Sequence, residues 1–247
     1  GPFGDLMSSC ISANASGAWD DDANWDLPPN GGDHEQIVFP ASIPADVVVA
    51  ADTSSRAKKV DQNAAHTVTV NGPFEFSTVD VNNLGVFDIA LTNGVLELAG
   101  PVRMLGDRTL KMTRSSKGGT LRISGAVEGA PTISKASGYI EGRPEAFGGA
   151  TLDLANSILR FTRSGTFWGT VWHPASNATG LGVEVPPGET VYVPGIFTNS
   201  TAFSMLGGGR LVLGNEGMTF VGGAAKSGDS RPVRDVTTGD APYAQGL

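Results

Sequence analysis

Short runs of alternating apolar and polar residues recur along most of the chain, separated by Gly, Asn and Pro. Such a run is typical of a β-strand, because successive side chains of a strand point to opposite faces. The runs predict strands at Ile37–Phe39, Val47–Ala50, Thr67–Val70, Phe74–Val81, Val86–Leu91, Val95–Leu98, Thr109–Thr113, Thr120–Ser124, Thr151–Leu154, Ile158–Thr162, Gly169–Trp172, Gly182–Val185, Thr190–Val193, Arg210–Leu213 and Met218–Val221. Helical periodicity is almost absent, and its best candidate is the short segment Ser54–Val60. The pattern therefore predicts an all-β protein.

One unit occurs several times: a glycine turn, then an apolar, a variable, an apolar and a small residue. The units lie at 71–76, 93–102, 118–127, 149–158 and 208–215. Their first apolar positions are Phe74, Leu96, Leu121, Leu152 and Leu211, separated by 22, 25, 31 and 59 residues. A period of about 20 to 30 residues suits one coil of a β-solenoid, which hydrogen-bonds to the next coil. We expect a parallel β-helix or β-solenoid. A β-sandwich or jelly roll is the alternative, since Gly-rich hairpins also contain many Leu-x-Leu segments.

The middle residues of these units are predicted to point outward, by the two-residue period of strands. They are Glu75, Glu97, Arg122, Asp153 and Val212, and in one common register they form a ladder on one exterior face. Arg122 beside Glu97 or Asp153 would offset like-charge repulsion between neighbouring strands. We interpret this face as a solvated surface. The alternative is a carboxylate-lined groove, with Glu97, Arg122 and Asp153 as the candidate catalytic residues.

Several segments of the first third share a pattern with a known group of proteins. They are Ala18–Trp25, Pro28-Pro29, Gly32-Asp33, Ile37–Phe39, Val47–Val49 and Thr67–Val70. Together with the Gly-Gly-x-Leu-x-Leu-x-Gly units, these segments resemble bacterial exported β-helix surface proteins, especially autotransporter passenger domains with strand repeats. The resemblance implies a right-handed parallel β-helix and an extracellular or cell-surface location.

The two ends of the chain differ from its middle. Residues 1–45 combine large aromatic residues with a polar, Pro-rich connector, and are predicted to form a cap or arm over the first coil. A cap has a physical purpose, because an open solenoid end exposes unpaired strand edges. Residues 46–223 are predicted to form the solenoid domain, and residues 224–247, which are poor in apolar side chains, an extended tail or linker.

Composition and charge narrow the classes of partner. Glycine occurs 34 times in 247 residues, about twice its usual share of roughly 7%, which agrees with many tight turns. The formal net charge of −8 argues against nucleic acid, because phosphate backbones are bound chiefly through Lys and Arg. No apolar run reaches the length of a membrane helix, so no membrane insertion is expected. The single Cys10 allows no internal disulfide.

Candidate metal chemistry is confined to one acidic segment. The three histidines, at positions 34, 66 and 173, form no zinc-binding pattern. Asp20, Asp21 and Asp22 are the candidate metal ligands, since several oxygens in a short segment suit calcium, a cation with six to eight oxygen ligands. The segment lacks the spaced acids and the glycine of an EF-hand loop. A capped turn with solvated carboxylates is therefore the preferred interpretation, and no cofactor is predicted.

Phe161, Phe167, Trp168 and Trp172 form the densest aromatic cluster of the sequence. Residues four apart on one strand share a face, so Trp168 and Trp172 are the candidate binding residues. Aromatic rings can stack on sugars, but they pack more often in a core or an interface. Core or subunit packing is preferred, and a sugar-binding platform is the alternative.

These features favour a structural function. We expect a non-enzymatic extracellular or surface protein that self-associates or adheres through its solenoid, with cell-surface polysaccharide as a further partner. One alternative is a polysaccharide-active lyase or hydrolase, which would require clustered carboxylates with Lys or Arg. Fold analogy alone supports that alternative. The other alternative is a virion coat or fibre protein.

Overall fold

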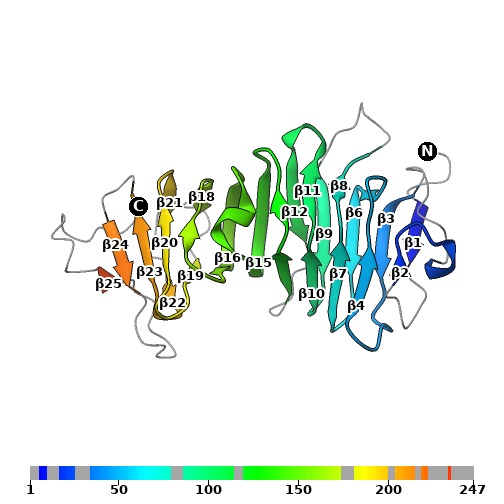
Figure 1. The fold of residues 1–247 in the computed structure, drawn as a ribbon, viewed down its shortest axis with the longest axis horizontal. Helices are drawn as coiled ribbons and strands as arrows, with labels where there is room; N and C mark the ends of the chain where they lie inside the picture. The colour runs from blue at the N-terminus through cyan, green and yellow to red at the C-terminus, as the bar shows by residue number, and fades with distance from the viewer. Residues whose placement is uncertain are drawn as a thin grey trace.

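The computed structural model describes residues 6–9, 17–25, 34–78, 86–113, 119–173, 181–199, 204–214, 218–221 and 233–234. These residues form an elongated parallel β-solenoid, with short strands stacked along one long axis (Figure 1). The predicted all-β solenoid is therefore confirmed. The alternative of a β-sandwich or jelly roll is wrong, because those folds pair their strands antiparallel, whereas every strand pair before the last two is parallel in the described part of the chain.

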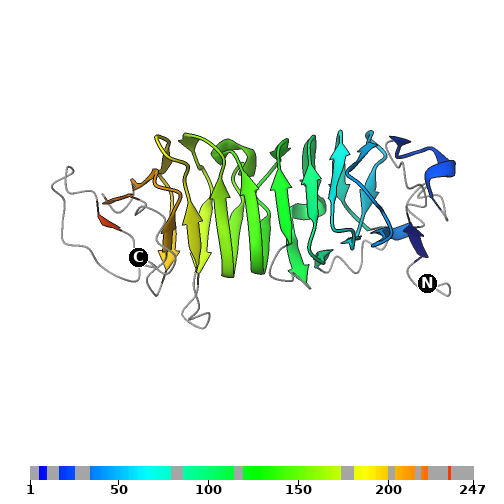
Figure 2. The ribbon, with the colours of Figure 1, turned by 90° about the horizontal axis from the view of Figure 1, so that it is seen from below.

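The strands of successive coils form three walls, and Figure 2 shows the stack from a second side. Wall 1 contains β1 (Leu6–Ser9), β3 (His34–Phe39), β6 (Lys59–Gln62), β9 (Phe87–Leu91), β12 (Thr109–Thr113), the first parts of β15 (Thr132–Gly142) and β16 (Thr151–Phe161), β18 (Thr170–His173) and β21 (Phe197–Asn199). Wall 2 contains β2 (Gly17–Ala18), β4 (Val47–Ala50), β7 (Thr67–Asn71), β10 (Val95–Leu98), β13 (Thr120–Ile123), the second parts of β15 and β16, β19 (Gly182–Glu184) and β22 (Ser204–Leu206).

Wall 3 is divided into two groups of strands by the 3-10 helix η4 (Pro144–Phe147). The first group is β5 (Arg56–Ala57), β8 (Phe74–Phe76), β11 (Pro101–Met104) and β14 (Ala126–Val127). The second group is β17 (Gly165–Thr166), β20 (Thr190–Val193), β23 (Arg210–Leu213), β24 (Met218–Val221) and β25 (Val233–Arg234). β24 and β25 pair antiparallel, so the stacking of parallel coils ends at β23.

The core is built from columns of apolar side chains that point inward from each wall. On wall 2 one column is Val47, Val68, Leu96, Leu121, Ile140, Leu159, Val183 and Met205, each the register partner of the next. All of these side chains are buried. Each coil therefore buries its own apolar face only when the next coil covers it, which is how a solenoid is stabilised.

A glycine in one inward column makes room for the helix η4. Gly142 is the register partner of Ile123 and Phe161, and a side chain at this position would meet the carbonyl oxygen of Ile123 at 2.6 Å and the ring of Phe147 at 3.2 Å. Phe147 is fully buried, and its ring centroid lies 6.2 Å from that of Phe161 and 6.0 Å from that of Phe167. The aromatic ring thus fills the space that the glycine leaves and fastens η4 to the core.

The register predicted from the repeated units is wrong for most of them. Only Leu96 and Leu121 are register partners. Phe74 pairs with Val102 and Leu211 with Val191, both on wall 3. Leu152 lies on wall 1, where its partners are Ile133 and Val171. The reason is that an apolar–variable–apolar strand occurs on all three walls, so the pattern alone does not show which wall a strand belongs to.

The helical candidate Ser54–Val60 is also wrong. Residues 56–57 form β5, and Lys59 and Val60 begin β6. β6 lies between β3 and β9, so its backbone groups pair with two neighbours. Tertiary pairing overrides the weak local preference of a short segment. No helix in the described residues is long and apolar enough to cross a membrane.

Aromatic side chains pack together near the N-terminal end of the core. The rings of Trp19 and Trp25 meet edge to face at 5.2 Å, and Trp19 also contacts Phe74 at 5.6 Å. Trp25 donates its indole N–H to the carbonyl of Trp19 at 2.8 Å. β3 belongs to the predicted cap by number, but it pairs with β6 in the main sheet. The boundary at residue 45 stays a prediction, and most of the tail at 224–247 lies outside the described residues.

Candidate functional site

The outward side chains of wall 2 form a ladder of alternating charge. Along five successive coils the register partners are Glu97, Arg122, Glu141, Arg160 and Glu184. Cross-strand neighbours of opposite charge attract, and like charges directly opposite repel. Every neighbour in this ladder is therefore favourable, and a slip of one residue between two coils would take their charges out of line.

The ion pairs of this ladder run continuously from coil to coil. Arg122 lies 4.0 Å from a carboxylate oxygen of Glu97 and 3.6 Å from one of Glu141. Arg160 lies 3.9 Å from Glu141 and donates a short hydrogen bond to Glu184. These side chains are partly buried. Ion pairs at a protein surface contribute about 0.2–1 kcal/mol each, so the ladder acts on register more than on total stability.

A second ladder follows wall 3 as far as η4. Arg56, Glu75 and Arg103 are register partners, and Glu128 follows because its N–H donates to the carbonyl of Val102. Arg103 donates to Glu75 at 2.6 Å. The hydrogen bond and charge of Glu75, with a smaller contribution from Glu128, raise the pKa of Arg103 above its ordinary value. The guanidinium is thus held as a cation between two carboxylates.

Wall 1 repeats the arrangement with lysine. Gln36, Lys59, Asp88 and Lys111 are successive register partners. The ammonium of Lys59 lies 3.9 Å from Asp88 and 3.7 Å from the buried Asp61. Each wall therefore has a stretch of successive coils over which outward charges alternate in sign: Lys59, Asp88 and Lys111 on wall 1.

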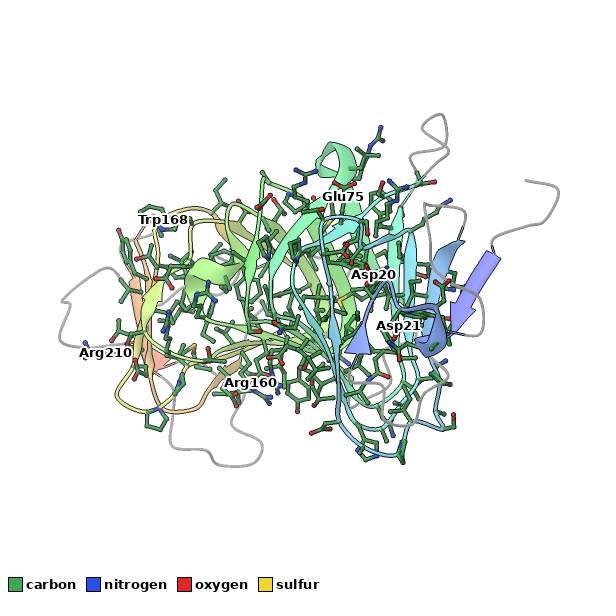
Figure 3. The ribbon with its side chains drawn as sticks, turned by 45° about the vertical axis from the view of Figure 1, so that its right-hand side comes forward. Asp20, Asp21, Glu75, Arg160, Trp168 and Arg210 are labelled. Carbon is green, nitrogen blue, oxygen red and sulfur yellow. The ribbon has the colours of Figure 1, made fainter. Side chains whose placement is uncertain are left out.

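The structure separates the three candidate catalytic residues. Glu97 and Arg122 are neighbours on wall 2, as the sequence predicted for that pair. Asp153 lies on wall 1, where its register partners are Ser134 and Trp172. Glu75 and Val212, the other members of the predicted single ladder, lie on wall 3. Figure 3 shows Glu75 and Arg160 on different sides of the solenoid. The predicted common face is therefore wrong, since its members are spread over three walls.

The acidic segment near the N-terminus forms the capped turn that was preferred. Asp21 is the N-cap of η1 (Asp22–Asn24), and its carboxylate accepts the N–H of Ala23 at 3.0 Å. Asp20 and Asp22 are exposed. Among the described residues the structure gathers no group of three His, Cys, Asp or Glu side chains suited to a metal ion. The side chains at 34 and 173 lie outside the described set, and His66 lies 4.0 Å from Asp46.

The aromatic cluster divides between core and surface. Phe161 and Phe167 are buried with their ring centroids 5.9 Å apart, so core packing is confirmed for these two. Trp168 lies in the turn between β17 and β18, and its side chain is 65% exposed. Trp172 lies in β18, but its side chain is outside the described set. The two tryptophans are not on one strand, so the spacing of four does not place them on one face.

Trp168, Tyr192 and Ile196 form what we call the aromatic patch. Tyr192 is 41% and Ile196 53% exposed. The segment holding Trp168 runs beside the one holding the other two: Phe167 donates its N–H to the carbonyl of Tyr192, and Val171 to that of Ile196. Figure 3 shows Trp168 toward the C-terminal end, far from Asp20 and Asp21. Exposed apolar groups gathered in this way mark interaction surfaces.

Sequence reasoning missed most of the ladder. Glu141, Arg160 and Glu184 were not identified, because the alignment of units placed Leu152 where Leu159 belongs. A signal was present in the sequence. A charged residue directly follows the inward apolar residue of the strand in Tyr139-Ile140-Glu141 and in Ile158-Leu159-Arg160, as it does in Val95-Leu96-Glu97. Arg103 follows Val102 in the same way.

Fold and surfaces together define a parallel β-solenoid whose walls are charge-paired from coil to coil. Comparisons of the chain with protein families, with curated proteins and with solved structures find no match.

Proposed function

We propose that this chain is a non-enzymatic structural protein, a β-solenoid building block that associates with further copies of itself through the aromatic patch. The observation that carries this proposal is the 65% exposure of Trp168 beside two other exposed apolar side chains. Large aromatic residues of this kind dominate the energetics of protein interfaces. An extracellular or cell-surface setting is part of the proposal, supported by the likeness of the Ala18–Trp25 segment and the Gly-rich units to exported β-helix surface proteins.

The charge ladders support a scaffold. Guanidinium and carboxylate groups on wall 2 are engaged with each other across coils. The ladder side chains thus stabilise the register of the coils and leave the aromatic patch as the surface available for contact.

Sedimentation velocity over a range of concentrations tests the proposal. We expect the full chain to form larger species as concentration rises, and the double variant W168S/I196S to shift toward the monomer. Val48 offers a matched control, since it is 42% exposed but lies on wall 2; V48S should associate as the unchanged chain does. A chain that stays monomeric at all concentrations would contradict self-association.

Electron micrographs of the same samples separate the structural alternatives. Filaments or irregular clusters agree with a building block, whereas closed shells would favour a virion coat. Adhesion to a polysaccharide would appear as retention of the monomer on an immobilised glycan. The W168S variant should not be retained, because it lacks the indole ring that would stack on sugar.

The polysaccharide-active enzyme makes a different prediction. If Glu97, Arg122 and Asp153 carried catalysis, their joint replacement by alanine would abolish turnover of an acidic polysaccharide. Because Asp153 lies on a different wall from the other two, we expect no turnover to depend on the trio. Loss of a measurable lyase or hydrolase activity in that variant would overturn the structural proposal.

A further inference from the structure

A small groove at the corner between walls 2 and 3 carries an excess of positive charge. It has a volume of about 200 Å³ and spans three coils. Its polar lining consists of Arg122, Glu141, Arg143, Arg163, Ser124 and Thr162. Three arginines and one glutamate thus line the groove, in a chain whose formal net charge is −8. The volume is below that of the roughly 300–1,000 Å³ pockets that hold drug-sized ligands, so it suits a small group.

The single carboxylate of the groove is already engaged. Glu141 lies within 4 Å of both Arg122 and Arg160 in the wall 2 ladder. Arg143 and Arg163 have no carboxylate within ion-pair distance among the described residues. The ladder therefore neutralises Arg122 and leaves the charges of the two corner arginines without a counter-charge from the chain.

The backbone holds Arg143 in place. Its side chain donates from Nη1 to the carbonyl of Ser124 on the preceding coil at 2.7 Å. Its backbone precedes Pro144 at the start of η4, in an extended conformation. Proline restricts the residue before it to that region. The guanidinium is thus already held against the neighbouring coil. The side chain therefore loses less conformational entropy when a ligand binds.

We propose that this corner groove binds an oxyanion, a carboxylate or a sulfate, between Arg143 and Arg163. Planar guanidinium groups offer paired N–H donors that match the oxygens of such groups. The hydroxyls of Ser124 and Thr162 line the same groove and supply further donors. Oxyanion binding does not depend on the aromatic patch, none of whose residues lines the groove, so failure of self-association leaves it intact.

Titration of the full chain with sodium sulfate and, separately, sodium glucuronate tests the site. The ionic strength is kept constant with sodium chloride, and the Nε–Hε resonances of the arginines report binding. We expect saturable shifts for Arg143 and Arg163. Removing either guanidinium, in R143A or R163A, should weaken binding about tenfold, as loss of a hydrogen bond to a charged group does.

Two further variants test whether binding needs the paired N–H donors of a guanidinium or only a positive charge, and whether it needs an arginine in the groove. R143K keeps the charge but loses the paired donors, so it should also bind more weakly. Arg108 is an exposed arginine outside the groove, and R108A should bind as the unchanged chain does. Circular dichroism confirms that each variant is folded.

The two anions identify the group. Saturation by sulfate alone assigns a tetrahedral ligand and saturation by glucuronate alone a carboxylate; both outcomes support the site. Linear shifts that never saturate, or equal weakening in R108A and R143A, would overturn it, because they would show only general screening of charge.

Discussion

The two halves of wall 3 carry the same interior and different exteriors. Before η4 the outward positions alternate in charge: Arg56, Glu75, Arg103 and then Glu128. After η4 the outward column of Thr166, Tyr192 and Val212 is uncharged, and Arg210 supplies an outward charge only in the neighbouring column of β23. The inward positions are apolar and buried in both halves, with Phe74, Val102 and Val127 before η4 and Phe167, Val191 and Leu211 after it.

This difference shows that the inward residues form the coil, whereas the outward residues are free to serve other roles. Inward side chains are alike because every coil must bury the same kind of face. Outward side chains are under no such constraint. In the first half they set the register by pairing charges, and in the second half they expose apolar surface that we assign to association. Variants that act on one half at a time can test this division.

The largest effect is expected at the junction of the halves. Phe147 of η4 is fully buried against Phe161 and Phe167, so F147A should lower the free energy of unfolding by about 3–5 kcal/mol. Urea unfolding followed by circular dichroism measures this. Exposed Trp168 is the control, since W168A should change stability by less than about 0.5 kcal/mol. An equal loss in both variants would contradict the junction's role.

A smaller loss is expected at a corner of the first half. A side chain on Gly125 would meet the carbonyl oxygen of Gly100 at 1.9 Å, and Gly125 is held in place because its N–H donates to the carbonyl of Leu98. G125A should therefore cost about 3 kcal/mol by overpacking. In the second half, Gly188 has a φ of +77° but no atom within 4 Å of an added side chain. G188A should cost about 1 kcal/mol from backbone strain alone, and the same urea experiment compares the two.

Charge reversal in the first half should produce a still smaller, salt-dependent effect. R103E would place a third carboxylate between Glu75 and Glu128, so the urea midpoint should fall further than in R103A, which only removes the attraction. At about 1 M salt the Debye length is about 3 Å, and the two variants should converge. A gap between them that salt does not narrow would show that the loss is not electrostatic.

The smallest effect concerns a carboxylate of the second half. Hydrogen bonds from the side chain and the backbone of Ser164 lower the pKa of Glu189 below its ordinary value of 4.5. Because the folded-state pKa is depressed, the contribution is complete above pH 4.5 and is lost as pH falls through the lower, folded-state value. E189Q should flatten the acid limb of stability below that pH. Thermal midpoints measured from acid to neutral pH check this, and unchanged curves would contradict it.

Asp52 is the matching group of the first half. Hydrogen bonds from Ser54 lower the pKa of this carboxyl as well. The same titration applied to D52N should therefore give a similar small change, since the local geometry does not depend on which half of the solenoid carries it.

Local pattern located most of the strands. Thr67–Val70, Val95–Leu98 and Arg210–Leu213 were predicted almost to the residue, because alternation and flanking glycines are encoded within a few positions. Strand β15 was missed, since Thr132–Gly142 includes a small, polar stretch that breaks the alternation. The second part of β15 carries Glu141, so the charge ladder of wall 2 was not predicted beyond Arg122.

Exposure of side chains was harder to predict than strand position. Phe167 and Trp168 are neighbours in sequence, yet one is buried and the other is the most exposed member of the aromatic patch. Aromatic character is common to both. Which of them faces η4 and the core follows from the turn between β17 and β18, and no local pattern encodes that choice.

The sequence by itself determined the class of fold: inward apolar positions and glycine turns specify short strands coiled in repeats. Tertiary structure alone decided which strands share a wall and which charges meet. Coil length varies, so Leu96 stacks on Leu121 but Ile140 on Leu159. With unequal coils, residues that occupy equal places in the repeated unit fall on different walls. Only the hydrogen-bonded register of the stacked strands brings Glu97, Arg122 and Glu141 into one line.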